Sequence, residues 1–408
     1  MWYFAARSPA LEPELIAMKY GIVIGGTVCA LLAGLMACEP LDDDRETHVV
    51  SQDNSFITLE EVAQLLSSVP LGTAQMEEVM DAASSSAENG YDEEYRMQDL
   101  FSAPGTGVGS EADTKAGERY PAPLRDLLSQ AVQKRFATKA GTEEDALAWL
   151  DSLSSSDVQI YWPYSEEWDG ETLPIITFDP GDAAEENIGY QLQADGSMTE
   201  VKKVDEAMAR ERPVWVVNRN ADAQHKTLEM MRREDPSWGQ GGGGLVVKSG
   251  EEPQTLILRS FKAKRQLDSW FCGGAEYFVK VGSVEDFHAA TEAELRLYEP
   301  SITDFMVVVR RKDAGKDLDL NTVLVSEWTD QLTSCAFMIV EDDGGTRTTW
   351  KCTAQGKYNS KQYGFDLEIP LNSRDDIVGR GSLSHAYIEK FKGQTASFGD
   401  VDLVLELI

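Results

Sequence analysis

Positive charge is scarce in this sequence. Its 408 residues include 37 Lys and Arg against 70 Asp and Glu, a formal net charge of −33. A chain this acidic repels the phosphates of nucleic acids and the headgroups of anionic lipids, so we expect no nucleic-acid partner. Hydrophobic residues make up 42% of the chain, a value typical of folded proteins, and this argues against wholesale disorder.

Catalytic motifs are missing as well. The four histidines include no pair at the spacing of an H-E-x-x-H zinc site. The sequence also lacks the G-x-S-x-G turn of α/β-hydrolases and the G-x-x-x-x-G-K-[ST] phosphate loop. The sequence therefore favours a non-enzymatic protein, and calcium is the one cofactor for which it offers ligands.

One apolar stretch, residues 20–37, lies near the N-terminus. Lys19 precedes it, Leu35, Met36 and Ala37 end it and Cys38 follows, which is the pattern of a secretory signal peptide. We expect translation to start at Met18, because the residues before it carry acidic side chains that suit neither a signal peptide nor a membrane span. The alternative is an uncleaved anchor, for which about 18 residues are marginal.

The end of this stretch resembles a bacterial lipobox, with Leu35, Ala37 and Cys38 at the matching positions. The acidic run 39–44 behind the cysteine resembles the export signal of surface-exposed lipoproteins of Bacteroidetes. The resemblance implies that Cys38 is lipidated, that several acyl chains anchor the protein in the outer membrane, and that the chain faces the outside of the cell. A solvated tether is the alternative interpretation of the acidic run.

The remaining pattern predicts an α+β multidomain protein. Apolar residues at helical spacing predict helices over 59–67, 74–86, 91–101, 122–136 and 143–153. Short β-rich runs begin at Val158, and a run of four glycines begins at Gly241. The predicted parts are a signal peptide (1–37), a lipidated cysteine with an acidic tether (38–56), a helical N-terminal layer (57–155), a small α+β unit (156–235), a Gly-rich linker (236–252) and a C-terminal antiparallel β-sandwich (253–408).

Eight or nine strands are predicted in the sandwich, one of them over 293–298. Cys335 and Cys352 flank an Asp-Asp-Gly-Gly segment. If Asp343 and Gly344 formed a two-residue turn, the two cysteines would lie directly opposite one another in paired strands. They are then a candidate disulfide, and two reduced thiols are the alternative.

Two segments are candidate binding sites. Tyr161, Trp162, Tyr164 and Trp168, with Asp169 beside them, could stack on a sugar ring, or the rings could be buried in a core. Asp342 and Asp343 are candidate calcium ligands at a loop tip, although aspartate also favours turns by accepting hydrogen bonds from its own backbone.

Three classes of function remain. The leading one is a cell-surface lipoprotein that acts as a non-enzymatic binding module for a glycan or a protein ligand. The second is a secreted carboxylate-based glycoside hydrolase with its site near residues 161–169. Two carboxyl groups in one cleft at the separation found in glycosidases would favour this class. The third is a structural or assembly component of the envelope, which long edge strands would indicate.

Overall fold

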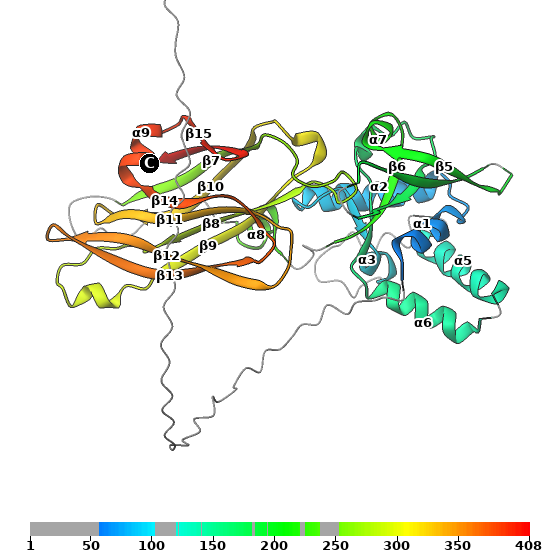
Figure 1. Cartoon of the computed structure of the whole chain (residues 1–408), viewed down its shortest axis with the longest axis horizontal. Helices are drawn as coiled ribbons and strands as arrows, with labels where there is room; N and C mark the ends of the chain where they lie inside the picture. The colour runs from blue at the N-terminus through cyan, green and yellow to red at the C-terminus, as the bar shows by residue number, and fades with distance from the viewer. Residues whose placement is uncertain are drawn as a thin grey trace, which may run out of the picture. The chain divides into compact units, whose positions relative to one another are not determined.

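The chain folds as a mixed α and β protein in which most sheets are antiparallel (Figure 1). No helix in the part of the chain described here is long and apolar enough to cross a membrane. The signal segment, Cys38, the tether and the four-glycine run lie outside that part. The computed structural model describes residues 57–102, 120, 122–139, 141–181, 184–193, 195–220, 225–236 and 253–408.

Four of the predicted helices are confirmed to within a few residues. Each has an apolar stripe that is buried, and two begin at threonine caps. The Thr58 hydroxyl accepts a hydrogen bond from the Glu61 amide at 3.2 Å, and Thr142 and Asp145 form a reciprocal capping box. These helices are α1 (Leu59–Ser67), α2 (Thr73–Glu88), α5 (Leu124–Thr138) and α6 (Glu143–Ser154).

The helix predicted over 91–101 is wrong in its first half. That half contains strand β1 (Glu94–Arg96), and only α3 (Met97–Phe101) is helical. β1 pairs antiparallel with β2 (Val158–Tyr161), so that Tyr95 lies opposite Ile160. The segment 57–155 and the following α+β segment therefore contribute strands to one sheet.

This mixed sheet has the strand order β1-β2-β6-β3-β4-β5. The β3–β6 pair is parallel and the other pairs are antiparallel. Successive residues of a strand face opposite sides. Trp215 and Val217 therefore join the core beneath the helices, whereas Val214 and Val216 join a second core. The remaining elements are β3 (Ile175–Phe178), β4 (Glu186–Leu192), β5 (Met198–Asp205), β6 (Val214–Arg219), η1 (Ser165–Glu167), α7 (Glu206–Glu211) and α8 (Leu228–Glu234).

Residues 253–408 form two further antiparallel sheets that share one hydrophobic core. The first sheet has the order β10-β7-β16-β15; the second has the order β13-β12-β11-β8-β9, with β14 also paired to β11. The strands are β7 (Gln254–Ala263), β8 (Ala275–Ser283), β9 (Ser301–Val309), β10 (Leu318–Trp328), β11 (Leu332–Glu341), β12 (Arg347–Tyr358), β13 (Lys361–Asn372), β14 (Asp376–Ser384), β15 (Thr395–Phe398) and β16 (Val401–Leu407). Three short helical segments lie between them: η2 (Glu294–Leu297), η3 (Arg311–Asp313) and α9 (His385–Phe391).

The strand predicted over 293–298 is wrong. This segment contains η2, in which Leu295 is buried and Leu297 is 76% exposed. Alternation of apolar residues over so few positions does not distinguish a strand from a single helical turn. Conversely, strand β14 was not predicted, because Gly379, Arg380 and Gly381 interrupt its apolar pattern.

The candidate disulfide between Cys335 and Cys352 is not formed, and the structure shows the alternative of two reduced thiols. Cys335 pairs with Leu383 of β14 and Cys352 pairs with Leu367 of β13, and both cysteines are free thiols. β14 pairs with β11 from Ser334 onward. β12 therefore pairs with β11 only where β11 begins, at Leu332 and Ser334. The two-residue turn that the prediction required does not form.

Candidate functional site

The predicted sugar platform is largely inside the protein. Tyr161, Trp162 and Tyr164 are 0%, 1% and 5% exposed. The Trp162 ring packs edge-on against Trp168 and Trp215, at centroid distances of 5.9 and 5.8 Å. Their faces are therefore part of the packed interior, which was the alternative interpretation of this segment.

Trp168 and Asp169 are held by local hydrogen bonds. The half-buried Trp168 donates from Nε1 to the Thr172 carbonyl at 2.9 Å. The Asp169 carboxylate accepts from the amides of Glu171 and Thr172 and from the Thr172 hydroxyl. These bonds lower the pKa of Asp169 to about 2, the hydroxyl contributing most. Asp169 therefore closes a turn, and no platform of exposed rings accompanies it.

Glu93 and Glu166 are the carboxyl pair nearest to the predicted hydrolase site. Lys312 lies 3.0 Å from Glu93 and also contacts Glu166. Burial and the hydrogen bond to Glu166 raise the pKa of Glu93, whereas hydrogen bonds from Glu93 and Lys312 lower the pKa of Glu166 despite its burial. Glu93 is 3% exposed and Lys312 pairs with both carboxylates, so the pair forms a partly buried ion cluster and not two carboxyls that flank an open site.

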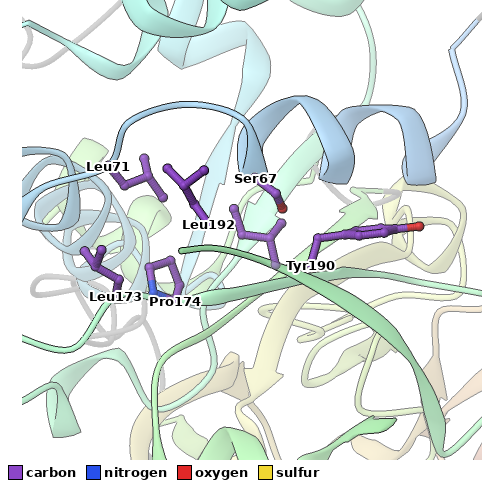
Figure 2. Close-up of a pocket in the computed structure, with 7 residues that line it drawn as sticks. Ser67, Leu71, Leu173, Pro174, Tyr190 and Leu192 are labelled. Atoms are coloured by element: carbon purple, nitrogen blue, oxygen red, sulfur yellow. The ribbon is translucent and has the colours of Figure 1, made fainter. Parts of the chain in front are cut away.

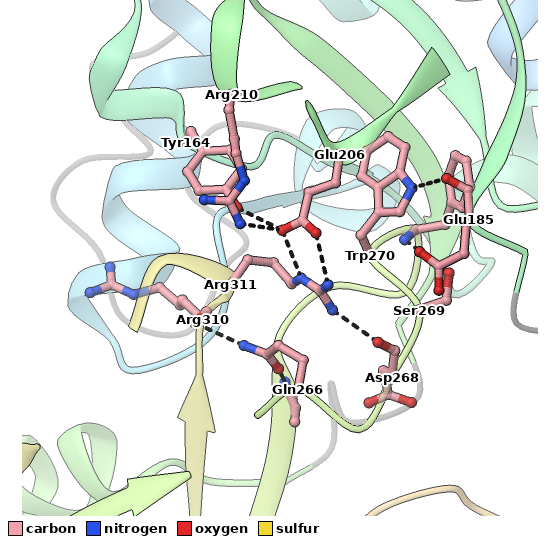
Figure 3. Close-up of polar contacts among 12 residues, drawn as sticks. Tyr164, Glu185, Glu206, Arg210, Gln266, Asp268, Ser269, Trp270, Arg310 and Arg311 are labelled. Atoms are coloured by element: carbon pink, nitrogen blue, oxygen red, sulfur yellow. Dashed lines mark hydrogen bonds and ion pairs between the residues drawn. The ribbon is translucent and has the colours of Figure 1, made fainter. Parts of the chain in front are cut away.

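A partly buried ion cluster is centred on Glu206 and Arg311 (Figure 3). The Arg311 guanidinium donates to both oxygens of Glu206, at 3.3 and 3.1 Å, and to the Asp268 carbonyl at 2.9 Å. The Tyr164 hydroxyl and Arg210 also donate to Glu206, at 2.7 and 2.8 Å. Although burial opposes it, these donors hold the pKa of Glu206 below its usual value. The cluster links α7 to η3 and to the loop after β7.

That loop, residues 264–274, is called the junction loop. Figure 3 shows Trp270 donating from Nε1 to the Glu185 carbonyl, at 3.0 Å, with Ser269 next to it. Trp270 and Phe271 are 1% and 0% exposed and share a core with the second face of the mixed sheet. The Gly274 amide donates to the buried Asp92 carboxylate at 2.6 Å. The loop therefore joins residues of the mixed sheet to β7 and β8.

A groove of about 550 Å³ lies between α1 and α5. Leu65, Pro70, Leu127 and Ala131 supply its apolar surface. Arg135 on its wall is ion-paired with Glu61. Its other polar lining residues are Gln64, Ser68, Gln130, Lys134, Thr138 and Lys139. The volume lies in the range of small-molecule sites, and the lining combines four apolar with seven polar or charged residues.

The two lysines of this groove are exposed at the C-terminal end of α5. Neither Lys134 nor Lys139 forms an ion pair with another residue of the described part. We predicted no site here from the sequence. The available signal was the local cluster of Lys134, Arg135 and Lys139 in a chain whose net charge is −33.

A second cavity lies between α1 and the mixed sheet (Figure 2). Leu71, Leu173, Pro174 and Leu192 line it, and its volume is about 10 Å³. A space of this size holds at most one water molecule. It is a packing defect and not a ligand site.

The candidate calcium ligands Asp342 and Asp343 lie near other carboxylates: Asp375 hydrogen-bonds to Asp342, and burial together with Asp268 and Asp376 raises the pKa of Asp343. Asp342 also accepts hydrogen bonds from the Gly344 amide at 2.8 Å and the Asn372 side chain at 3.2 Å, as expected for a turn residue. Three different carboxylates lie closest together among the described residues: one oxygen each from Asp268, Glu276 and Glu341 lies within 4.8 Å of the others. The sequence could not indicate this cluster, because its members come from a loop and two different strands.

No protein-family model, no curated protein and no solved structure matches this chain. Its function therefore rests on the geometry of its own sites.

Proposed function

We propose that this chain is a lipid-anchored, non-enzymatic binding protein of the bacterial cell surface. The anchor rests on the lipobox resemblance at Cys38. In the same proposal, residues 253–408 form a β-sandwich domain. The core shared by two antiparallel sheets supports this, with Phe261 of one packed on Tyr277 of the other at 5.3 Å between ring centroids.

The α1–α5 groove is the proposed ligand site, and its ligand is a small organic anion with an apolar body. The observation that supports this ligand is a groove in which four apolar residues lie beside two lysines that have no ion-pair partner among the described residues, in a protein whose net charge is −33. Elsewhere the surplus of carboxylates repels an anion. Lys134 and Lys139 reverse that sign locally, and the leucines and Pro70 can bury an apolar chain.

The other two classes of function receive less support. The aromatic stretch 161–168 is mostly buried, and Glu93 is 3% exposed and shares Lys312 with Glu166. Strand β13 at the end of its sheet is long, but it carries Pro370 and the exposed Asp366 and Glu368, features that discourage addition of a further strand.

The test uses 1-anilinonaphthalene-8-sulfonate, a fluorescent anion with an apolar body, and decanoate as competitor. We expect saturable fluorescence that decanoate displaces. In the variant Lys134→Glu/Lys139→Glu the local charge changes from +2 to −2, as the sequence dictates. If each exposed pairing contributes up to about 1 kcal/mol and each reversal adds similar repulsion, affinity falls by roughly tenfold or more.

The matched control is Lys202→Glu/Lys357→Glu, which makes the same charge change at two exposed lysines on β5 and β12. It should bind the probe as the unmodified protein does. Equal loss in both double variants would mean that only net charge matters. Unchanged binding in the groove variant would place the probe elsewhere. Either result would contradict the proposed site.

A further inference from the structure

Three carboxylates converge at the end of the shared core. Glu341 is the last residue of β11, Glu276 is the second residue of β8 and Asp268 lies in the junction loop. One oxygen of each lies within 4.8 Å of the others. Like charges at this separation repel one another strongly unless a proton or a cation lies between them.

Glu341 is the most unusual member of the cluster. It is 1% exposed, and its Oε1 has no hydrogen-bond partner among the described residues. Tyr277 lies directly opposite Glu341 in the paired strand, and its buried hydroxyl likewise has no partner within the described part. Buried carboxylates are normally paired, hydrogen-bonded or bound to a metal, because leaving one unpartnered costs several kcal/mol.

Around Glu341, the described residues offer little compensating positive charge. Burial, a hydrogen bond with Asp268, and the charges of Asp268, Asp343 and Asp376 raise the pKa of Glu341. The nearest arginines are used elsewhere: Arg265 pairs with Asp400 at 2.8 Å, and Arg311 pairs with Glu206. In the described part of the chain, no lysine or arginine forms an ion pair with Asp268 or Glu341.

We propose that Asp268, Glu276 and Glu341 bind one calcium ion. All three offer hard carboxylate oxygens, and no nitrogen or sulfur ligand joins them. Calcium accepts six to eight such oxygens in irregular geometry and tolerates bidentate carboxylates, whereas magnesium requires a near-ideal octahedron. The ion supplies the partner that the buried Glu341 oxygen otherwise lacks.

The ion also has a structural consequence. Asp268 is two residues before Trp270, whose ring is buried against the mixed sheet. Glu276 and Glu341 belong to paired strands of the other core. Calcium therefore fastens the junction loop to β8 and β11, and so regulates how firmly residues of the mixed sheet are held to β7 and β8.

The experiment uses the full chain, stripped of metal with a chelator and dialysed at pH 7.5. Equilibrium dialysis with radioactive calcium should find one bound ion per chain. Calcium should raise the melting temperature and slow amide hydrogen exchange in residues 264–274. Magnesium at the same concentration should do neither.

The variant Glu341→Gln separates calcium binding from a shared proton. It should lose the bound calcium and the rise in melting temperature, while it folds in chelator as the unmodified protein does. Glu292→Gln, at an exposed loop residue, is the matched control and should keep both responses. If Glu341→Gln does not fold, Asp268→Asn at the half-buried loop position replaces it.

Two outcomes would overturn the proposal. One is the absence of bound calcium and of any calcium-dependent change in the unmodified protein, which would mean that Glu341 and Asp268 share a proton instead. The other is calcium binding that survives in both cluster variants, which would place the ion at another group of carboxylates. Binding of the fluorescent anion in the α1–α5 groove is a separate readout and does not depend on either result.

Discussion

Replacing Trp270 with alanine should strongly destabilise the protein. The ring is 1% exposed, packs on Phe271 at a centroid distance of 4.1 Å and donates to the Glu185 carbonyl at 3.0 Å. Burial of a tryptophan removes roughly 150–250 Å² from water, and each Å² contributes about 25 cal/mol. Alanine recovers only a small part of this, so Trp270→Ala should cost about 3–5 kcal/mol of unfolding free energy.

Urea denaturation followed by circular dichroism measures this loss. Trp270→Phe should cost roughly 1–2 kcal/mol, because it keeps most of the apolar surface and loses the hydrogen bond. Trp168→Ala is the matched control. It removes a similar hydrogen bond to a carbonyl, but its ring is half-buried, so it should cost less than Trp270→Ala.

The result that would refute this reasoning is a loss below about 1 kcal/mol for Trp270→Ala, the level expected of a surface position. The junction loop would then not be packed as described. An equal loss of unfolding free energy for Trp270→Ala and Trp168→Ala would show that the burial of the ring does not determine the cost of removing it.

Two further predictions concern close packing and anchoring. Gly356→Ala should cost about 1–3 kcal/mol in urea denaturation, because an added Cβ would lie 2.3 Å from the Phe287 ring, whereas Gly381→Ala, with open space around it, should cost under about 1 kcal/mol. Equal costs would contradict the packing around Gly356. Cys38→Ser should abolish incorporation of radioactive palmitate in a bacterial host that processes lipoproteins, and labelling that persists in the variant would refute the lipobox assignment.

Local structure in this chain was predictable where a single periodic signal extended over two or more turns. The apolar stripes of α1, α2, α5 and α6 and the caps at Thr58 and Thr142 are properties of neighbouring residues, and they determined those helices. The short segment 91–101 was not predictable in the same way. Pairing of β1 with β2, which is distant in sequence, overrode its helical pattern.

The candidate sites depended on contacts that no local pattern records. Cys335 and Cys352 had the right spacing for a hairpin, but β14 competed for the same edge of β11. The aromatic stretch at 161–168 was visible, whereas its burial depended on which core received each ring. The same residue types can face a core or face a ligand, so the residue types alone do not distinguish the two.

The sequence by itself determined the charge of the protein and most of its helices and strands, and it is the basis of the proposed location at the cell surface. These follow from composition and from neighbours a few residues apart. Only the tertiary structure brought Asp268, Glu276 and Glu341 within 4.8 Å and placed Lys134 and Lys139 beside the apolar residues of one groove. The physical reason is that sites arise where segments far apart in the chain converge, and convergence is decided by packing of the whole core.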